Sequence, residues 1–255
     1  MSKKTVFYSD PMNDDFAHSN GRIAVERITG NYPYERSKLW TVCSGALYYV
    51  IVLPIVYAIM KLKYGLRIRN RKSLRKLKSG AFLYGNHTNG FPDAVCPAIL
   101  SAPKRAFVVT GPEAVSIKGI RALVSMLGAV PLPEDYSGWK KFVRSIQEKT
   151  EKNTVMIYPE AHIWPYYTGI RPFRETSFKY PYEMGRPVVA SVITYRRRKL
   201  LKSLAPLVTV TLSEPFFPGD YESAKALRDA VYEFMVGVSS EDNYAYWTYE
   251  RKDAI

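Results

Sequence analysis

Residues 81–93 read AFLYGNHTNGFPD, and this stretch indicates both how the chain folds and where a reactive site could lie. The apolar and aromatic run at residues 81–86 is typical of a buried β-strand. His87 follows it directly, and Asp93 comes six residues after the histidine. A histidine can act as a general base near neutral pH, and a carboxylate on its other ring nitrogen would fix the reactive tautomer. The same residues are also found in ordinary polar turns, so the rest of the chain has to decide between the two interpretations.

Strand-like and helical segments alternate from Gly80 onward. Segments rich in β-branched and aromatic residues lie at 81–86, 106–110, 154–159, 187–195 and 207–212. Helical segments lie at 93–102, 120–128, 138–150 and 222–238. This alternation predicts an α/β domain over residues 79–240, with a largely parallel sheet flanked by helices. Residues 1–38 are predicted to be an N-terminal extension, because they show turn signals but no helical period, and residues 241–255 a C-terminal tail.

The run LWTVCSGALYYVIVLPIVYAIM, residues 39–60, is 22 residues long, carries no charge and lies between Lys38 and Lys61. A bilayer core of about 30 Å needs roughly 20 apolar residues in a helix. The run therefore predicts an N-terminal membrane-associated helical segment. Pro54 would kink a helix, so a broken helix pair that enters one leaflet fits the pattern as well as a simple span does. The remaining alternative is a buried core helix.

A basic stretch follows, since residues 61–78 hold nine Lys or Arg and no acidic residue in a chain of net charge +14. Beside a membrane segment, each such charge gains about 1 kcal/mol from anionic lipid, and basic flanks mark the cytoplasmic side. We therefore assign residues 39–78 to an anionic membrane surface, with the α/β domain on its cytoplasmic face. A solvated loop or an RNA-binding arm would have the same composition, but no recognition motif accompanies it, and we expect no nucleic-acid partner. Cys43 and Cys96 offer no metal-ligand spacing, so we expect no metal site.

Two later stretches hold further polar residues that suit substrate binding. YPEAHIWP ends a predicted strand and contains Glu160 and His162. GIRPFRETSFK contains Arg171 and Arg174, whose planar guanidinium groups match phosphate oxygens. Taken singly, the first stretch is also consistent with a structural turn and the second with a basic surface turn.

Taken together and in this order, these stretches resemble the lysophospholipid acyltransferase family, whose best-known members are the 1-acylglycerol-3-phosphate acyltransferases. NHTNGFPD resembles the first family motif, NHxxxxD, and Tyr158-Pro159-Glu160-Ala161 resembles the phenylalanine-proline-glutamate-glycine loop of the third. In the family, a basic turn like Pro172-Phe173-Arg174 and a strand that begins like Pro187-Val188-Val189 follow. Lys118 lies where the second motif is expected. An N-terminal membrane-associated helix pair is usual in the family.

The resemblance covers about residues 65–235, and three departures from the family pattern fall inside it. Asp93 is six residues from His87, where the family has five, and a one-residue bulge in the turn could absorb the difference. The second motif lacks its final arginine, and Ala161-His162-Ile163 stands where the third motif has glycine-threonine-arginine. The arginines associated with substrate phosphate are thus missing from two places. Either the arginines of the later basic turn substitute for them, or the acceptor is a different lipid.

The resemblance implies transfer of a fatty acyl group from an acyl thioester, acyl-CoA or acyl-ACP, to the hydroxyl of a lysophospholipid. The first acceptor it implies is 1-acylglycerol-3-phosphate, which would give phosphatidic acid, and no cofactor beyond the thioester co-substrate is expected. His87 would be the general base and Asp93 its orienting partner. The residues implied in substrate binding are Asn86, Lys118, Glu160, His162, Arg171 and Arg174.

The partners would then be the lysophospholipid, the acyl thioester, the anionic membrane surface and, for an acyl-ACP donor, acyl carrier protein. Two other interpretations remain open from the sequence. One is a lipid thioesterase or hydrolase, in which water replaces the acceptor hydroxyl. The other is a non-catalytic membrane-binding protein, which predicts that His87 and Asp93 lie far apart or fully buried.

Overall fold

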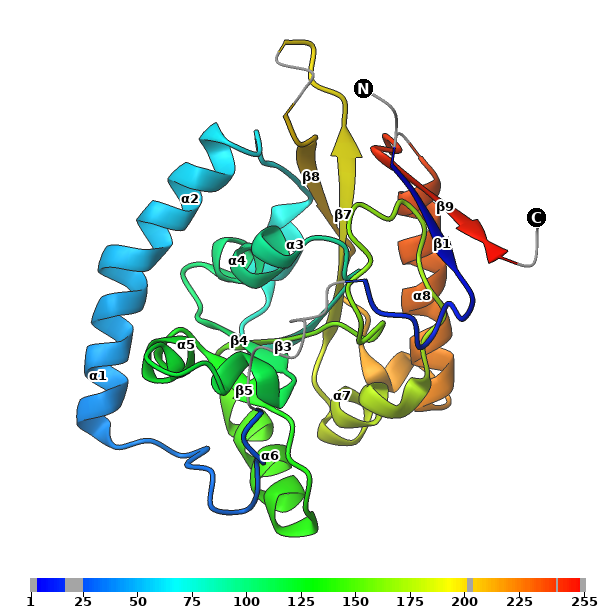
Figure 1. The fold of residues 1–255 in the computed structure, drawn as a ribbon. Helices are drawn as coiled ribbons and strands as arrows, with labels where there is room; N and C mark the ends of the chain where they lie inside the picture. Colours follow the sequence, from blue (N-terminus) through cyan, green and yellow to red (C-terminus); the bar gives the residue numbers. More distant parts are fainter. Residues whose placement is uncertain (1–3, 17–24, 201–203, 242, 253–255) are drawn as a thin grey trace.

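Seven of the described strands form one sheet, and this sheet positions the candidate site. The computed structural model describes residues 4–16, 25–200, 204–241 and 243–252. All neighbouring strands are parallel except the pair β7–β8. The predicted α/β class with a largely parallel sheet is therefore confirmed. Across the sheet, the strands lie in the order β2 (Arg67–Arg69), β8 (Leu207–Leu212), β7 (Val188–Arg196), β3 (Ala81–Gly85), β6 (Thr154–Ile157), β4 (Ala106–Thr110) and β5 (Ala129–Pro131) (Figure 1).

Helices cover both faces of this sheet. Side chains of β3 alternate between two buried clusters, with Phe82 and Tyr84 in one and Ala81 and Leu83 in the other. Because successive side chains of a strand point to opposite faces, the sheet is buried on both sides, as is typical of α/β folds. Besides the long N-terminal helix described below, the helices are α3 (Arg71–Lys76), α4 (Gly90–Ser101), α5 (Arg121–Met126), α6 (Tyr136–Lys149), α7 (Lys179–Met184) and α8 (Ala224–Ser240), with the 3₁₀ turns η2 (Pro112–Val115), η3 (Glu175–Phe178) and η4 (Pro218–Asp220).

Local signals in the sequence set several helix ends. The Asp135 carboxylate accepts a hydrogen bond of 2.8 Å from the Gly138 N–H at the start of α6. The Ser223 hydroxyl accepts one of 3.1 Å from the Ala226 N–H at the start of α8. Asp and Ser are preferred at the N-cap position, directly before the first helical residue, because their side chains accept a hydrogen bond from an otherwise unpaired N–H. Gly128 follows α5 with φ of +106°, a left-handed conformation that glycine adopts readily where a helix ends.

The apolar run forms one continuous helix along a flank of the domain (Figure 1, left). α1 (Lys38–Ala46) passes into a π-helical turn, η1 (Leu47–Val52), and then into α2 (Leu53–Leu62). Pro54 follows the π-helical turn and has no N–H to donate. The missing hydrogen bond therefore falls where the regular α-helical hydrogen-bond pattern is already interrupted. The helix Lys38–Leu62 is 25 residues long, and its apolar window has mean hydropathy 2.1 with 17% of its residues buried. By length and composition this helix could cross a membrane, and its exposure does not fit a core helix.

One side of this helix packs against the domain. Ser44 and Tyr48 are buried near one end and Val56 and Met60 near the other, and within each pair the spacing of four residues places both side chains on one side of the helix. The Ser44 hydroxyl donates a hydrogen bond of 2.7 Å to the carbonyl of Met126. The amide of Ala106 donates one of 3.1 Å to the phenol oxygen of Tyr48. The helix is therefore attached to the domain along its length.

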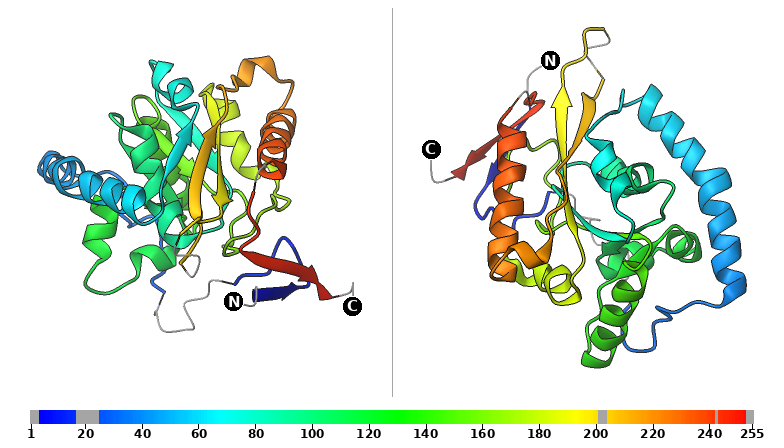
Figure 2. Two further views of the ribbon diagram at one scale, coloured as in Figure 1. Left: turned by 90° about the horizontal axis from the view of Figure 1, so that it is seen from above. Right: turned by 180° about the vertical axis from the view of Figure 1, so that it is seen from behind.

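Several segments have structure that the sequence patterns did not predict. β1 (Lys4–Tyr8) and β9 (Trp247–Arg251) pair in parallel as a separate two-stranded sheet (Figure 2). Ile28, in the predicted extension, is 1% exposed and belongs to the main core. The basic stretch contains β2 and α3. These segments are short, and their partners are far away in the sequence, so local periodicity does not reveal them.

The burial of Ile28 predicts that residues 25–37 contribute to stability. Ile28→Ala should lower the free energy of unfolding by about 2–5 kcal/mol, because it leaves a cavity in the core. Val25→Ala, three positions earlier, is the matched control, since Val25 is 48% exposed and its truncation should change the value by no more than about 0.5 kcal/mol. Urea unfolding measures both. Equal effects of the two substitutions would contradict the packing of this segment.

Candidate active site

The side chains of His87 and Asp93 meet where the chain leaves the carboxyl end of β3. Nδ1 of His87 lies 2.7 Å from Oδ2 of Asp93, and the exposed fractions of the two side chains are 18% and 1%. An ionised carboxylate only accepts hydrogen bonds, so Nδ1 carries the hydrogen in this pair. Nε2 then keeps its lone pair. The arrangement is therefore a partly exposed base held by a buried acceptor.

The first turn of α4 brings Asp93 back to the histidine. The Asp93 N–H donates a hydrogen bond of 2.9 Å to the carbonyl of Asn89, and Oδ2 of Asp93 accepts one of 2.8 Å from the Asn89 N–H. Pro92 is tolerated because N–H groups in the first turn have no intrahelical partner. The spacing of six residues is thus absorbed by a helical turn, and the predicted bulge is not needed.

Tyr158 is part of the same arrangement, although the sequence analysis assigned it no role. Its ring stacks on the imidazole of His87, with centroids 4.4 Å apart and planes 14° apart. Its hydroxyl donates a hydrogen bond of 2.5 Å to the carbonyl of Asp93. Tyr158 follows β6, which neighbours β3 in the sheet. An aromatic residue directly after a neighbouring strand is the signal that could have identified it.

Burial raises the pKa of the Asp93 carboxyl, and the hydrogen bond from His87 acts in the opposite direction. The negative charge of Asp93 is therefore stabilised by its hydrogen-bond donors more than by water. The pair is thus suited to accept a proton at Nε2.

Glu160 connects two loops from inside the protein. Its Oε2 accepts a hydrogen bond of 3.1 Å from the His87 N–H, and its Oε1 accepts one of 3.0 Å from the Arg171 N–H. Nη2 of Arg171 also lies 3.2 Å from Oε2, and neither side chain is exposed. Burial raises the pKa of Glu160 and lowers that of Arg171, and each opposes the shift in the other. The pair therefore fixes the backbone of the histidine.

This burial changes the roles that were predicted for Glu160 and Arg171. The Arg171 guanidinium donates to the carbonyl of His162 and lies 5.0 Å from the ring centroid of Trp164. Neither side chain is accessible to a ligand in this conformation. Direct contact with substrate is thus replaced by an internal role, in which the pair holds the loop after β6 against the loop after β3.

Asn86 is also internal. Its side-chain oxygen accepts a hydrogen bond of 2.8 Å from the Ile193 N–H, and its side-chain nitrogen donates one of 3.0 Å to the Ile193 carbonyl. Asn86 is 1% exposed. It ties the end of β3 to β7, so the predicted contact with substrate does not fit its position.

Three other predicted residues remain accessible. Nδ1 of His162 lies 3.4 Å from Oδ2 of Asp15, and the His162 side chain is 37% exposed. Arg174 is exposed at the start of η3, and Lys118 is exposed in the loop between η2 and α5. These are the predicted substrate-binding side chains that a ligand could reach.

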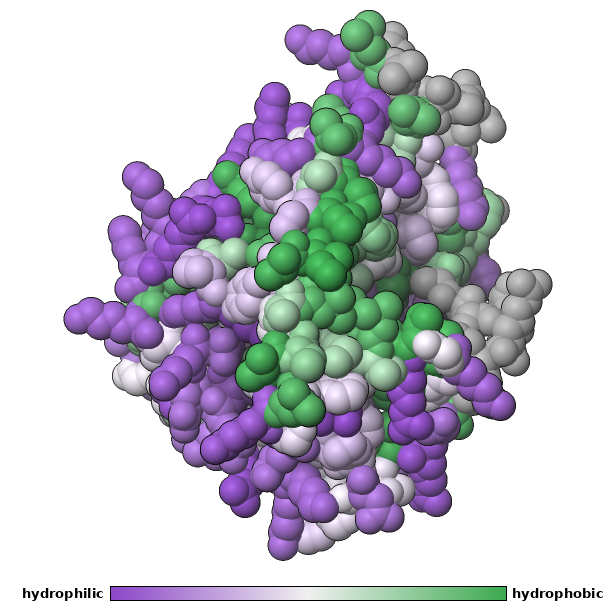
Figure 3. Space-filling view, turned by 90° about the vertical axis from the view of Figure 1, so that its left-hand side faces the viewer, coloured by the Kyte–Doolittle hydropathy of each residue, from purple (hydrophilic) through white to green (hydrophobic). Residues whose placement is uncertain are grey.

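An apolar band covers the face of the molecule that carries the long helix. Figure 3 shows it as a continuous region with hydrophilic residues on its borders. Its exposed large side chains come from the outer side of the long helix and from α5 and its approach: Leu39, Val42, Tyr49, Val50, Ile51, Ile55, Tyr57, Leu62, Ile120 and Leu123. Large exposed apolar patches mark contact with membranes or partner proteins.

One of three comparisons with known proteins found a similar fold. No family model matches the sequence, and no curated protein matches it. Among solved structures, the chain is similar to the crystal structure of the 1-acyl-sn-glycerophosphate (LPA) acyltransferase PlsC from Thermotoga maritima. The TM-score is 0.57 at 16% sequence identity, and the match covers 79% of this chain and 86% of that chain. The shared fold is the one expected from the sequence resemblance.

The internal role of Arg171 predicts a loss of stability on substitution. Arg171→Met should lower the free energy of unfolding by about 3–5 kcal/mol, because it leaves the buried Glu160 carboxylate without its ion-pair partner. Arg174→Met is the matched control and should change the value by no more than about 0.5 kcal/mol, since Arg174 is exposed. Chemical denaturation compares the two. If Arg171→Met is as stable as the control, Arg171 is free to bind substrate.

Proposed function

We propose that this protein is a membrane-associated O-acyltransferase. It moves a fatty acyl group from an acyl thioester, acyl-CoA or acyl-ACP, to the hydroxyl of a lysophospholipid. The first acceptor to test is 1-acylglycerol-3-phosphate, and the product is then phosphatidic acid. The observation that carries this proposal is the 2.7 Å contact between His87 and Asp93, at the carboxyl end of a central strand, in a fold similar to that of an LPA acyltransferase.

In this mechanism, Nε2 of His87 removes the proton from the acceptor hydroxyl while the oxygen attacks the thioester carbonyl. Asp93 holds the ring in the required tautomer and stabilises the imidazolium as it forms. The carbon–sulfur bond then breaks, and the imidazolium returns the proton to the leaving thiolate. The acceptor oxygen is the nucleophile, so the reaction needs no acyl-enzyme and neither cysteine. Positioning of the two substrates supplies the rest of the rate enhancement.

The accessible cations are the candidates for the acceptor phosphate. Arg174 is exposed on the loop that follows β6, and it offers a bidentate donor to phosphate oxygens. Lys118 and His162 are further candidates, since both side chains can reach solvent. Glu160 and Arg171 take part indirectly, because they hold the His87 backbone.

The apolar band suits an enzyme whose acceptor is a membrane lipid. The long helix is attached to the domain along its length, through Ser44 near one end and Met60 near the other. A helix held in this way lies in the membrane surface with its outer side in the acyl region, as amphipathic interfacial helices do. The lysolipid can then reach the site without full transfer into water.

A thiol-release assay tests this function. Purified protein is given an acyl thioester with lysophosphatidic acid, with other lysophospholipids, with glycerol 3-phosphate, or with no acceptor. Thiol release that depends on a lysolipid, with a matching diacyl product, supports the transferase. Equal release without an acceptor identifies a thioesterase or hydrolase, and no release under any condition leaves the non-catalytic membrane-binding protein.

Substitutions at the pair test the mechanism. His87→Ala should lower the rate of acyl transfer by at least about 10²–10⁴-fold, the usual contribution of a general base, and Asp93→Asn should also lower it strongly. His162→Ala is the comparison, because it removes an imidazole that is not paired with Asp93, and it should cost less than tenfold. Binding to vesicles should stay unchanged in all three variants. Near wild-type turnover of His87→Ala would refute the assignment of the base.

Arg174→Ala tests the phosphate contact. It should raise KM for lysophosphatidic acid by about tenfold or more, because a charge-assisted hydrogen bond to phosphate is lost. Lys225→Ala removes an exposed charge of the same sign from α8, and its KM should match that of the wild type. Steady-state kinetics separate KM from kcat. An unchanged KM in Arg174→Ala would move the phosphate site to another residue.

A further inference from the structure

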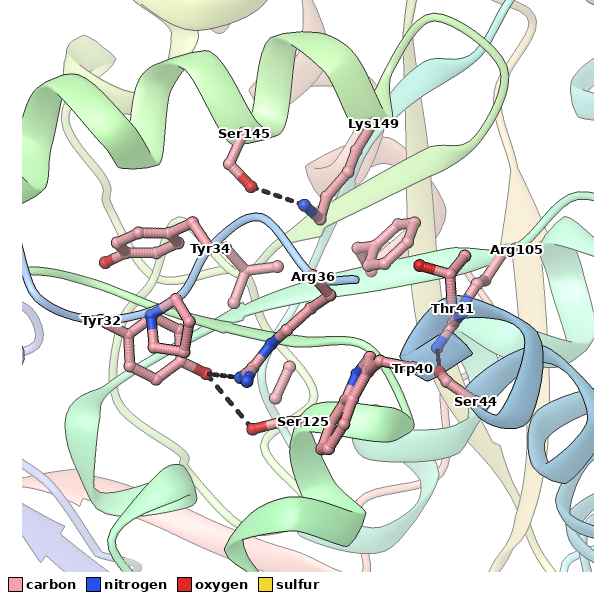
Figure 4. Close-up of a pocket in the computed structure, with 14 residues that line it drawn as sticks. Tyr32, Tyr34, Arg36, Trp40, Thr41, Ser44, Arg105, Ser125, Ser145 and Lys149 are labelled. Carbon is pink, nitrogen blue, oxygen red and sulfur yellow. Dashed lines mark hydrogen bonds between the residues drawn. The ribbon is translucent and has the colours of Figure 1, made fainter. Parts of the chain in front are cut away.

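A basic cavity lies beside the amino end of β4, away from His87, which follows the carboxyl end of β3. It has a volume of about 130 Å³ and is lined by the segment before α1, the start of α1, β4, α5, β5 and α6 (Figure 4). Three cations line it, Arg36, Arg105 and Lys149, and no acidic residue does. The aromatic rings of Tyr32, Tyr34, Trp40 and Phe107 and the hydroxyls of Thr41, Ser44, Ser125 and Ser145 complete the lining.

None of the three cations has a carboxylate partner within the described part of the chain. Nη2 of Arg36 lies 3.5 Å from the phenol oxygen of Tyr32, and its guanidinium lies 4.7 Å from the ring centroid of Trp40. Nζ of Lys149 donates a hydrogen bond of 2.5 Å to the Ser145 hydroxyl. The nearby carboxylates of Glu35 and Glu148 are held instead by Arg144, at 3.5 and 2.9 Å. The cavity therefore has an excess of positive charge.

Arg105 is held at the inner end of this cavity. Its Nη2 donates to the Ser44 hydroxyl and to the carbonyl of Met126. Its Nε is buried and has no partner among the described residues. Burial, together with the charges of Arg105 and Arg36, lowers the pKa of Lys149 to about 8, against the opposing effect of Glu148. A bound anion would offset this repulsion and satisfy the free donors.

From these contacts we infer that the cavity binds the phosphate group of an anionic membrane phospholipid. Guanidinium and ammonium groups that converge with hydroxyls are the chemistry of phosphate recognition. At roughly 30 Å³ per water, the cavity has the volume of about four waters. This volume is enough for a headgroup phosphate but not for acyl chains. A neighbouring hollow of about 280 Å³ shares Tyr32, Arg36 and Trp40 with it and extends to Arg121 on α5.

The surroundings point to a lipid as the source of the phosphate. The hollow ends at α5, whose exposed Leu123 belongs to the apolar band, and α1 contributes Leu39 and Val42 beside Trp40. A phospholipid with its phosphate in the cavity could therefore place its acyl chains along the band. Trp at such a boundary is typical of a membrane interface.

This cavity is separate from the proposed active site. Ala106 and Ala81 are level in the sheet, because both pair with Thr154. Arg105 precedes Ala106, whereas His87 lies six residues beyond Ala81. The two sites are thus about 20 Å apart along the strands, at about 3.3 Å per residue. The inference rests on the membrane attachment proposed above but not on acyl transfer.

Vesicle flotation of the full chain tests it. The vesicles are phosphatidylcholine alone, phosphatidylcholine with phosphatidylglycerol, and phosphatidylcholine with oleate adjusted to the same surface charge. The wild type should bind the phosphatidylglycerol vesicles several-fold more tightly than the oleate vesicles, because only the former offer phosphate on an anionic headgroup. Arg36→Gln/Lys149→Gln should lose this preference. Arg36→Glu, which alters one exposed side chain, should lose it without a risk to folding.

Lys72→Gln/Lys76→Gln is the matched control, since it removes two exposed charges from the basic stretch. It should weaken binding to both anionic vesicles equally and keep the preference.

A preference that survives in the Arg36 variants, or is absent from the wild type, would overturn the inference. Binding of inorganic phosphate by the wild type but not by Arg36→Glu, together with no preference among the vesicles, would also overturn it and would indicate a site for free phosphate. Absence of binding to every vesicle would overturn the membrane attachment as well, whereas thiol release reports acyl transfer separately.

Discussion

The buried carboxylate of Asp93 is the constraint on which the rest of the site depends. It is removed from water and accepts hydrogen bonds from the imidazole of His87 and from the Asn89 N–H. Because burial raises the pKa of this carboxyl, a positive charge on the imidazole stabilises it more than solvent does. The first turn of α4 sets the position of Asp93, and the stacked ring of Tyr158 sets that of His87. In the proposed mechanism, this packing is therefore what allows the histidine to act as the base.

The sequence predicted the parts of the fold and the site that local pattern encodes. Strands and helices from Gly80 onward follow from runs of β-branched and aromatic residues and from apolar residues at helical spacing. His87 and Asp93 were found because they are close in the chain and one follows a strand. They are joined by a helical turn and not by a bulge. The sequence alone does not distinguish the two, since Gly, Phe and Pro occur in both.

The sequence did not predict features that depend on burial by distant segments. Glu160 and Arg171 were predicted to contact substrate from the family resemblance and the match of guanidinium to phosphate, but Trp164 and the loop after β3 pack against them. Asn86 was placed beside the substrate, whereas its amide is used by Ile193 in β7, 107 residues away. β1 pairs with β9, which lies near the other end of the chain. A strand of five residues has too little periodicity to indicate a pairing partner at that sequence separation.

The long helix relates the two proposed lipid sites to the membrane. Its 25 residues extend about 37 Å at 1.5 Å per residue, and contacts with one domain hold it near both ends, at Ser44 and at Met60. If it crossed the bilayer, these ends would lie on opposite sides of the membrane, and a single domain packed along the helix would have to occupy the acyl region. A charged surface cannot do so without a large desolvation cost. In the proposed attachment the helix lies in the membrane plane and the apolar band enters the leaflet, so that the cavity around Arg36 and the basic stretch at residues 61–78 lie at opposite ends of the band. Both can then contact the headgroups of a single leaflet.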